Sequence, residues 1–334
     1  MDQIRWGVLG ASDFARREMA PAIHAAPGHV LAALASRSPD KAAPFAALAP
    51  GLRVHGAYEA LLADAEVDAV YIPLPHTMHV EWGLKALAAG KHVLIEKPVA
   101  MHADEIAPLI AARDRTGLVA AEAYMIVHHP QWRSVRAMLA DGVVGALCHV
   151  EGVFTYDNSG DPGNIRNRAV TGGGALPDIG VYSYGSTRWA TGAEPVEITS
   201  AVIDWEDGCD AFARVGARMA RRDGTRFTGH WVNSMRMMPE QSVLFHGDAG
   251  LIRMTAPFNA ARFGAATVQW RGLDGVTHSR AWHGVDHYVL QIDAFGAAVR
   301  GERPFPWTLE DARGTQAMID MAYEAAGGRP PAGR

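Results

Sequence analysis

The sequence predicts two domains of different class. Residues 1–122 are expected to form an α/β domain with a doubly wound parallel sheet, and residues 123–334 an α+β domain with a large, mostly antiparallel, open-faced sheet. Up to about residue 124, short apolar runs alternate with Ala-rich helical segments, and long alternating stretches follow after about residue 145. A chain of 334 residues is long enough for both, because single hydrophobic cores stop growing at about 250–300 residues.

The first domain is expected to contain five buried strands separated by helices. Parallel strands covered on both faces are typically continuous apolar runs. Helices are predicted at Phe14–Ala26 and Val80–Ala89, and Gly90 stands where a left-handed residue would end the second helix. The predicted strands are Ile4–Gly10, Val30–Ser36, Val67–Pro73, His92–Glu96 and Leu118–Tyr124.

In the second domain, the alternating strands indicate a largely antiparallel sheet with one face against helices and the other free for a partner. Helical spacing returns at Val285–Arg300 and Leu309–Ala326. The Gly- and Pro-rich tail Gly327–Arg334 is expected to be loose. The predicted strands are Leu147–Tyr156, Val196–Trp205, Ala211–Ala220, Thr225–Ser234 and Val243–His246.

Bulk composition narrows the classes of protein. With 49% hydrophobic and 20% charged residues, the chain is globular rather than disordered. A net charge of −5 without a Lys/Arg run argues against a nucleic-acid partner. Cys148 and Cys209 are too few for a disulfide framework. Residues Met1–Arg5 lack the start of a signal peptide, and no apolar stretch could span a bilayer. We therefore expect a soluble cytoplasmic protein with no membrane partner.

A phosphate-binding loop is predicted directly after the first strand. The segment Gly10-Ala11-Ser12-Asp13-Phe14-Ala15 is a variant of the Gly-x-Gly-x-x-Gly/Ala loop. Gly10 supplies the tight turn, Ala15 lets the helix pack close to the strand, and Ser12 replaces the middle glycine. The N-terminus of the helix then presents free N–H groups to a pyrophosphate. The alternative is an ordinary β–α turn, but its position after the first strand favours a Rossmann domain.

The end of the second strand favours NADP over NAD. NAD enzymes usually place Asp or Glu there to bind the ribose. This chain has Ser36-Arg37-Ser38, with Lys41 a few positions further on. Arg37 can pair with a 2′-phosphate and the serines can donate hydrogen bonds to it. The alternatives are that Arg37 is a solvated loop charge and that NAD is the cofactor.

Further motifs cover nearly the whole chain. They are Pro73…His79, Ala89-Gly90-Lys91-His92-Val93, Glu96-Lys97-Pro98, Glu122-Ala123-Tyr124-Met125, His129-Pro130-Gln131, Gly172–Tyr182 and Tyr288…Gln291…Phe295…Arg300-Gly301. Together they resemble the glucose–fructose oxidoreductase/inositol dehydrogenase (Gfo/Idh/MocA) family. Tyr182, where many members carry His, and Asn164-Ile165-Arg166 resemble its branch of sugar and dihydrodiol dehydrogenases.

This resemblance implies a substrate site between a Rossmann domain and an open-faced sheet domain. It implies Lys97, Asp178 and Tyr182 as the catalytic group. The expected cofactor-binding residues are Gly10, Ala11, Ser12, Asp13, Phe14, Ser36, Arg37, Ser38, Lys41, Leu74, Pro75, His79, Glu96 and Lys97. The expected substrate contacts are Tyr156, Arg166, Asp178, His129 and His287.

The three catalytic residue types suit hydride transfer at an alcohol carbon. Oxidation needs a base for the hydroxyl proton, and reduction needs an acid for the carbonyl oxygen. Tyr182 can serve as either if a nearby cation such as Lys97 lowers its pKa. Asp178 can orient sugar hydroxyls or keep Lys97 protonated. The alternatives are a surface lysine, a helix-capping aspartate and a core tyrosine.

We therefore predict an NADP-dependent enzyme that moves hydride between the nicotinamide and a CH–OH/C=O group of a sugar. The polyhydroxylated substrate is its small-molecule partner, and a homodimer or homotetramer is expected through the C-terminal sheet. One alternative is a trans-dihydrodiol dehydrogenase. Another is a non-catalytic regulator that senses NADP, which the presence of all three catalytic residues disfavours. His76 and His79 lack a third ligand, so no metal is predicted.

Overall fold

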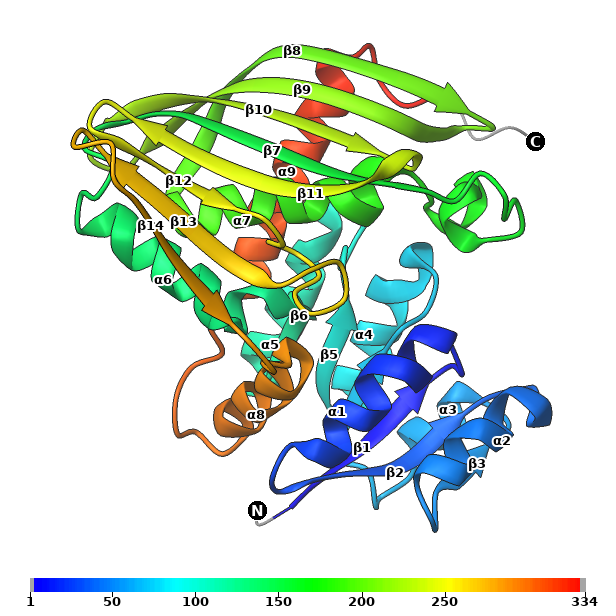
Figure 1. The fold of residues 1–334 in the computed structure, drawn as a ribbon. Helices are drawn as coiled ribbons and strands as arrows, with labels where there is room; N and C mark the ends of the chain where they lie inside the picture. Colours follow the sequence, from blue (N-terminus) through cyan, green and yellow to red (C-terminus); the bar gives the residue numbers. More distant parts are fainter. Residues whose placement is uncertain (1–2, 331–334) are drawn as a thin grey trace. The chain divides into compact units, whose positions relative to one another are not determined.

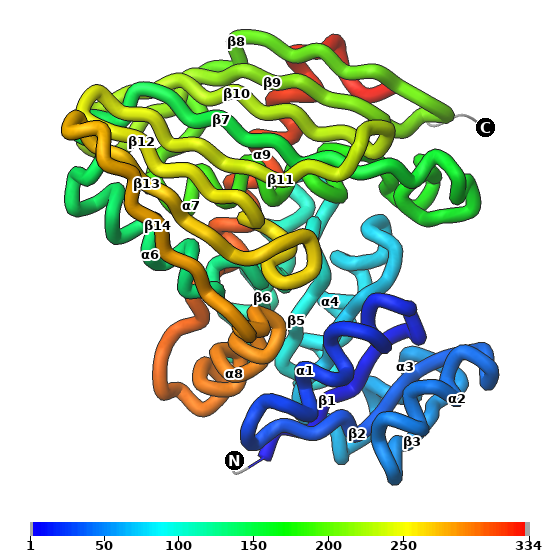
Figure 2. The backbone as a smooth tube through the Cα atoms, in the orientation of Figure 1, coloured from blue at the N-terminus to red at the C-terminus, as the bar shows by residue number. Residues whose placement is uncertain are grey.

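A computed structural model describes residues 3–330, which form two compact units (Figures 1 and 2). The first unit comprises the residues up to 128 together with residues 286–313. The second comprises residues 129–285 and those from 314 onwards. The expected domain limits, 1–122 and 123–334, stay a prediction.

The first unit is built on a six-stranded parallel sheet with the order β3-β2-β1-β4-β5-β6. This is the order of the doubly wound dinucleotide-binding fold, in which ligands bind beyond the carboxyl ends of the strands where the order reverses. The reversal lies between β1 and β4. The strands are β1 (Ile4–Leu9), β2 (His29–Ala35), β3 (Arg53–His55), β4 (Ala69–Ile72), β5 (His92–Glu96) and β6 (Ala120–Ala123).

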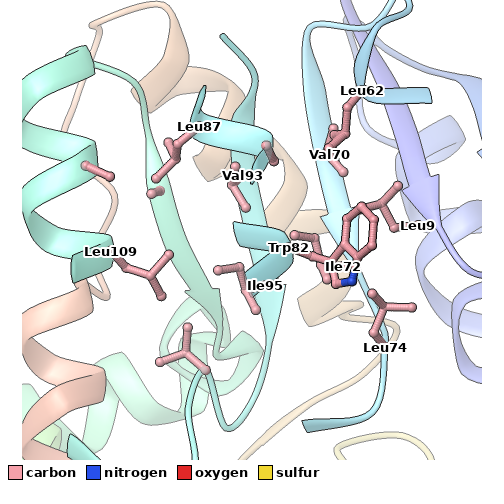
Figure 3. Packing of buried hydrophobic residues seen from close by; sticks show 14 of the residues in the cluster. Leu9, Leu62, Val70, Ile72, Leu74, Trp82, Leu87, Val93, Ile95 and Leu109 are labelled. Atoms are coloured by element: carbon pink, nitrogen blue, oxygen red, sulfur yellow. The ribbon is translucent and has the colours of Figure 1, made fainter. Parts of the chain in front are cut away.

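Helices cover both faces of this sheet, because its strands are apolar on both sides. On one face, Trp82 lies in a buried cluster with Leu9 and Ile72 (Figure 3). On the other face, the rings of Trp6 and Phe295 lie 5.0 Å apart, so the C-terminal segment completes the core of this unit. The helices are a π-helical turn (Ala15–Met19) that continues into α1 (Ala20–Ala25), α2 (Pro39–Leu48), α3 (Tyr58–Leu62), α4 (His79–Ala88), α5 (Ala107–Thr116) and α8 (His287–Val299).

The second unit is built on an eight-stranded sheet with the order β14-β13-β12-β11-β7-β10-β9-β8 (Figure 1). The β7–β10 pair is parallel and the other pairs are antiparallel. Helices α6 (Pro130–Ala140) and α7 (Val181–Thr191) pack against the sheet, and α9 (Leu309–Ala325) passes from the first unit into the second. The strands are β7 (Leu147–Asp157), β8 (Ala193–Glu206), β9 (Cys209–Arg221), β10 (Arg226–Ser234), β11 (Arg236–Gly247), β12 (Gly250–Met254), β13 (Ala266–Gly272) and β14 (Thr277–Trp282).

The predicted fold class is confirmed, and every predicted strand and helix has a counterpart in the structure. Gly90 has φ +77°, as expected for the residue that ends a helix. The strands β3, β12, β13 and β14 were not predicted. β3 has three residues and β14 is an edge strand with five of its six residues exposed, so neither carries an apolar pattern.

Two further observations concern the start of β11 and the C-terminal tail. β11 begins at Arg236, seven residues before the predicted start, because its first half is exposed and lacks apolar alternation. Of the tail that was expected to be loose, residues 327–330 lie outside helices and strands, and residues 331–334 lie outside the described residues. Between residues 3 and 330, no helix has the length and apolar character needed to cross a membrane.

Candidate active site

The loop after β1 has the geometry of a phosphate-binding turn. Gly10 has φ +100°, and a Cβ at this position would lie 3.0 Å from the Leu74 side chain. The positive φ favours glycine, and a Cβ would also be in tight contact with the Leu74 side chain. The Ser12 hydroxyl accepts a hydrogen bond from the Ala15 N–H at 3.1 Å, at the start of the helical segment. Asp13 forms 2.6 Å ion pairs with two arginines on the next turn, Arg16 and Arg17.

The turn after β2 presents an exposed arginine. The Ser36 hydroxyl accepts from the Ser38 N–H at 3.2 Å and donates to the Ser38 carbonyl at 3.0 Å. The Ser38 hydroxyl caps α2 by accepting from the Lys41 N–H at 3.4 Å. Arg37 is exposed between these serines. The nearest acid, Asp40, lies in the first turn of α2 and not at the end of β2.

The loops after β4 and β5 are joined by a buried histidine. The His79 ring lies with Nδ1 2.8 Å from the Pro98 carbonyl oxygen and Nε2 2.8 Å from the Leu74 carbonyl oxygen. Burial lowers the pKa of His79 to about 4, although both carbonyls oppose this shift. The neutral ring has one N–H and donates it to one of the two carbonyl oxygens, while the buried ring as a whole lies against both loops.

Lys97 directly follows β5, and 8% of its surface is exposed. The preceding Glu96 accepts from the Tyr71 hydroxyl at 2.6 Å and from the Lys97 N–H at 3.3 Å. Gly10, Arg37 and Lys97 therefore all follow carboxyl ends of parallel strands. That edge of the sheet is where this fold binds its ligands.

In the second unit, two of the predicted residues bind the side-chain carboxylate of a third, Asp178. Asp178 is 5% exposed. Its Oδ1 accepts from Arg166 Nε at 3.0 Å and its Oδ2 accepts from the Tyr156 hydroxyl at 2.6 Å. The charge of Asp178 raises the pKa of Arg166, and burial together with that charge raises the pKa of Tyr156. Arg166 is thus a fixed cation, and Tyr156 stays a proton donor to Asp178.

Tyr182 lies in the first turn of α7, close to this cluster. Asp178 belongs to a π-helical turn, Leu176–Gly180, that leads into α7, so both residues are helical. Tyr182 interacts electrostatically with Arg166. Its ring packs 5.8 Å from that of Phe154 and 5.9 Å from that of Phe258. These two rings were not predicted, because buried aromatic residues of a sheet give no separate sequence signal.

The two remaining substrate candidates are buried histidines. His129 caps α6 by accepting from the Gln131 N–H at 3.1 Å, and burial lowers its pKa to about 4. His287 lies in the first unit with its ring 4.5 Å from that of Tyr288. Their roles in substrate binding stay predictions.

Sequence reasoning missed two buried carboxyls that support these segments. Glu122 of β6 accepts from the Val99 N–H at 2.9 Å and from the Trp307 indole N–H at 2.8 Å. Asp210 of β9 accepts from the Leu176 N–H at 2.6 Å and from the Tyr323 hydroxyl at 2.7 Å. For Glu122 the available signal was an acidic residue within an otherwise apolar strand, since such residues are rarely buried without partners. The strand of Asp210 contains several arginines and gives no such signal.

The fold and site residues define an NAD(P)-dependent oxidoreductase. In the first unit, a parallel sheet with the Rossmann strand order has Lys97 at its carboxyl edge. In the second unit, Tyr182 lies beside the Arg166–Asp178 pair. Residues 4–124 match the family described as "Oxidoreductase family, NAD-binding Rossmann fold", and residues 132–253 match the GFO/IDH/MocA C-terminal domain. The chain belongs to the GFO/IDH/MocA family, as its motifs predicted.

Several relatives act on sugars according to their names. A dTDP-3,4-didehydro-2,6-dideoxy-alpha-D-glucose 3-reductase of Actinomadura kijaniata is 36% identical over 97% of this chain and 96% of its own. A D-xylose 1-dehydrogenase (NADP(+)) of Haloferax volcanii is 30% identical over 96% and 97%. The crystal structure of KijD10, a 3-ketoreductase from Actinomadura kijaniata in complex with NADP and TDP-benzene, is 33% identical, has a TM-score of 0.85 and covers 95% of this chain and 96% of that chain.

Proposed function

We propose that this protein is an NADP-dependent oxidoreductase that transfers hydride between the nicotinamide and a CH–OH/C=O group of a sugar. The observation that carries the proposal is that the chain contains two residue sets suited to hydride transfer. Lys97 lies at the carboxyl edge of the parallel sheet, and Tyr182 lies beside the Arg166–Asp178 pair. The sugar reductase and sugar dehydrogenase names of the relatives support this substrate class.

The first unit fits the cofactor. The Gly10 turn leaves room that a Cβ would fill, and the helical segment from Ala15 begins beside it. Backbone N–H groups at such a helix start bind pyrophosphate. Arg37 and its flanking serines would hold the 2′-phosphate that distinguishes NADP from NAD. When bound, NADP supplies or accepts the hydride.

The chain's own residues would move the proton. Tyr182 donates its hydroxyl proton to a carbonyl oxygen in reduction and removes a hydroxyl proton in oxidation. The Lys97 ammonium would donate a charge-assisted hydrogen bond to a substrate oxygen. Asp178 has both carboxylate oxygens engaged, so it acts by fixing Arg166 as a second cation beside Tyr182.

The proposal also includes the cellular location and the oligomeric state of the protein. We place the protein in the cytoplasm, because Cys148 and Cys209 are free thiols. We also propose a homodimer or homotetramer through the sheet face on which exposed residues such as Arg218 and Glu197 pair across β9 and β8. Sedimentation of the purified protein tests the assembly, and a monomer at micromolar concentration would contradict it.

A binding titration followed by a turnover screen tests the function. NADPH and NADH are titrated by fluorescence, and the preferred cofactor is then supplied with aldoses, a dTDP-linked keto sugar and a trans-dihydrodiol. We expect tighter binding of NADPH and turnover of a free or nucleotide-linked sugar. Turnover of the diol alone would assign the dihydrodiol activity instead. Tight NADPH binding without turnover of any of them would favour the sensing regulator.

A further inference from the structure

The backbone that follows Lys97 is not held by the sheet. The hydrogen-bonded register of β5 and β6 ends at Glu96 and Ala123. Lys97 is the next residue, and Pro98 has no N–H to donate. Side chains contact polar backbone groups of this segment, namely the Pro98 carbonyl and the Val99 N–H.

Two buried side chains bind those groups from different elements. His79, at the start of α4, contacts the Pro98 carbonyl oxygen at 2.8 Å. Glu122, on β6, accepts from the Val99 N–H at 2.9 Å. Glu122 is 1% exposed and His79 is fully buried, so water does not compete for either contact.

Glu122 is itself anchored. Its second carboxylate oxygen accepts from the Trp307 indole N–H at 2.8 Å, and the Trp307 ring stacks on Tyr124 at 4.2 Å. Glu122 also interacts electrostatically with Lys97 and with Glu96. The Trp307 indole thus binds the Glu122 carboxylate, and this carboxylate binds the backbone of Val99, two residues beyond Lys97.

We infer that Glu122 is a positioning residue for Lys97. Its carboxylate fixes the Val99 backbone on one side of Pro98 while His79 fixes the Pro98 carbonyl, and together they determine where the Lys97 ammonium is presented. The inference rests on the proposed catalytic role of Lys97. A displacement of about 1 Å at a reacting group can reduce turnover by about a hundredfold.

The variant Glu122→Gln tests this role, with Glu105→Gln as the matched control. A glutamine oxygen can replace one of the two acceptor contacts, while its NH₂ group opposes the other donor. Glu105 also accepts two backbone N–H groups, those of Met101 and His102, but it is exposed. For Glu122→Gln we expect kcat to fall by about tenfold to a hundredfold, with KM and NADPH affinity nearly unchanged. Glu105→Gln should leave all three unchanged.

A second readout does not depend on turnover. The rate at which an amine-reactive reagent labels Lys97 is measured by mass spectrometry relative to exposed Lys85, together with hydrogen exchange at the Val99 amide. Both rates should change severalfold in Glu122→Gln and not in Glu105→Gln. If the wild type turns over no substrate while this change is seen, the proposed function fails but the positioning role stands.

Opposite results would overturn the inference. Unchanged labelling of Lys97 in a folded Glu122→Gln variant would show that the carboxylate does not set its position. If the wild type is active, an unchanged kcat in Glu122→Gln would also contradict the positioning role. If Glu122→Gln does not fold, Trp307→Phe removes the anchoring donor alone, and it should reproduce the kcat loss on a smaller scale with KM preserved. Unchanged kcat in Trp307→Phe would then count against the role.

Discussion

In each of the two units, a buried carboxyl group binds the backbone of a segment near a proposed catalytic residue. Glu122 in the first unit and Asp210 in the second are buried carboxyls that each accept one backbone N–H and one aromatic donor. Both aromatic donors, Trp307 and Tyr323, come from the C-terminal part of the chain. Burial raises the pKa of Glu122 to about 7 and that of Asp210 to about 6.

What the two carboxyls hold is different. Glu122 binds a loop residue, Val99, in the segment that follows β5. Asp210 binds Leu176 at the start of a helical segment that its own hydrogen bonds maintain. Gly174 makes this approach possible, because its φ is +136° and a Cβ would lie 1.9 Å from an Asp210 oxygen. Loss of Glu122 should therefore affect positioning, whereas loss of Asp210 should affect mainly stability.

The largest expected effects test whether both units contribute to catalysis. Lys97→Ala in the first unit and Tyr182→Phe in the second should each lower kcat by about 10²–10⁴-fold, the range for a general acid–base group and its partner. NADPH affinity should stay within about tenfold, since uniform binding is little changed. Steady-state rates and fluorescence titrations measure both. An undiminished kcat in either variant would restrict the chemistry to the other unit.

The sequence was most informative where the backbone conformation itself demands particular residues. The Gly10 turn and the glycine at position 90 could be predicted because turns and helix ends restrict residue type. The Lys97, Asp178 and Tyr182 assignments depended on a family resemblance, because no local pattern links residues so distant in the chain. Glu122 and Asp210 escaped prediction because their partners, Trp307 and Tyr323, are over a hundred positions away.

The pH dependence of stability compares the two carboxyls directly. Each has a folded-state pKa above its usual value, so its stabilising contribution is present at low pH and is lost as pH rises through the folded value. For Glu122 the window runs from 4.5 to about 7, and for Asp210 from 3.8 to about 6. Each change corresponds to about 3 kcal/mol of unfolding free energy.

Urea denaturation of Glu122→Gln and Asp210→Asn across these windows measures the effect. Relative to wild type, each variant should become more stable as pH rises, because the amide does not ionise. The change for Asp210→Asn should be complete at a lower pH than that for Glu122→Gln. A constant difference from wild type at all pH values would mean that the carboxyl concerned has an ordinary pKa.

The smallest effect concerns the cofactor end of the first unit, which has no counterpart in the second. Arg37→Ala should weaken NADP binding by about 1–3 kcal/mol, as for a hydrogen bond to a charged group, and leave NAD binding nearly unchanged. Parallel titrations with the two cofactors provide the comparison. Equal losses for NADP and NAD would contradict a role at the 2′-phosphate.

The central proposal is that Lys97 and Tyr182 both serve the same catalytic step. A double-variant cycle tests it most directly, by measuring kcat/KM for Lys97→Ala, Tyr182→Phe and their combination in protein that still binds NADPH. Groups that act as one catalytic device are strongly non-additive. We therefore expect the double variant to be within about tenfold of the slower single variant. Losses that multiply across the two positions would show that the residues act independently and would contradict the proposal.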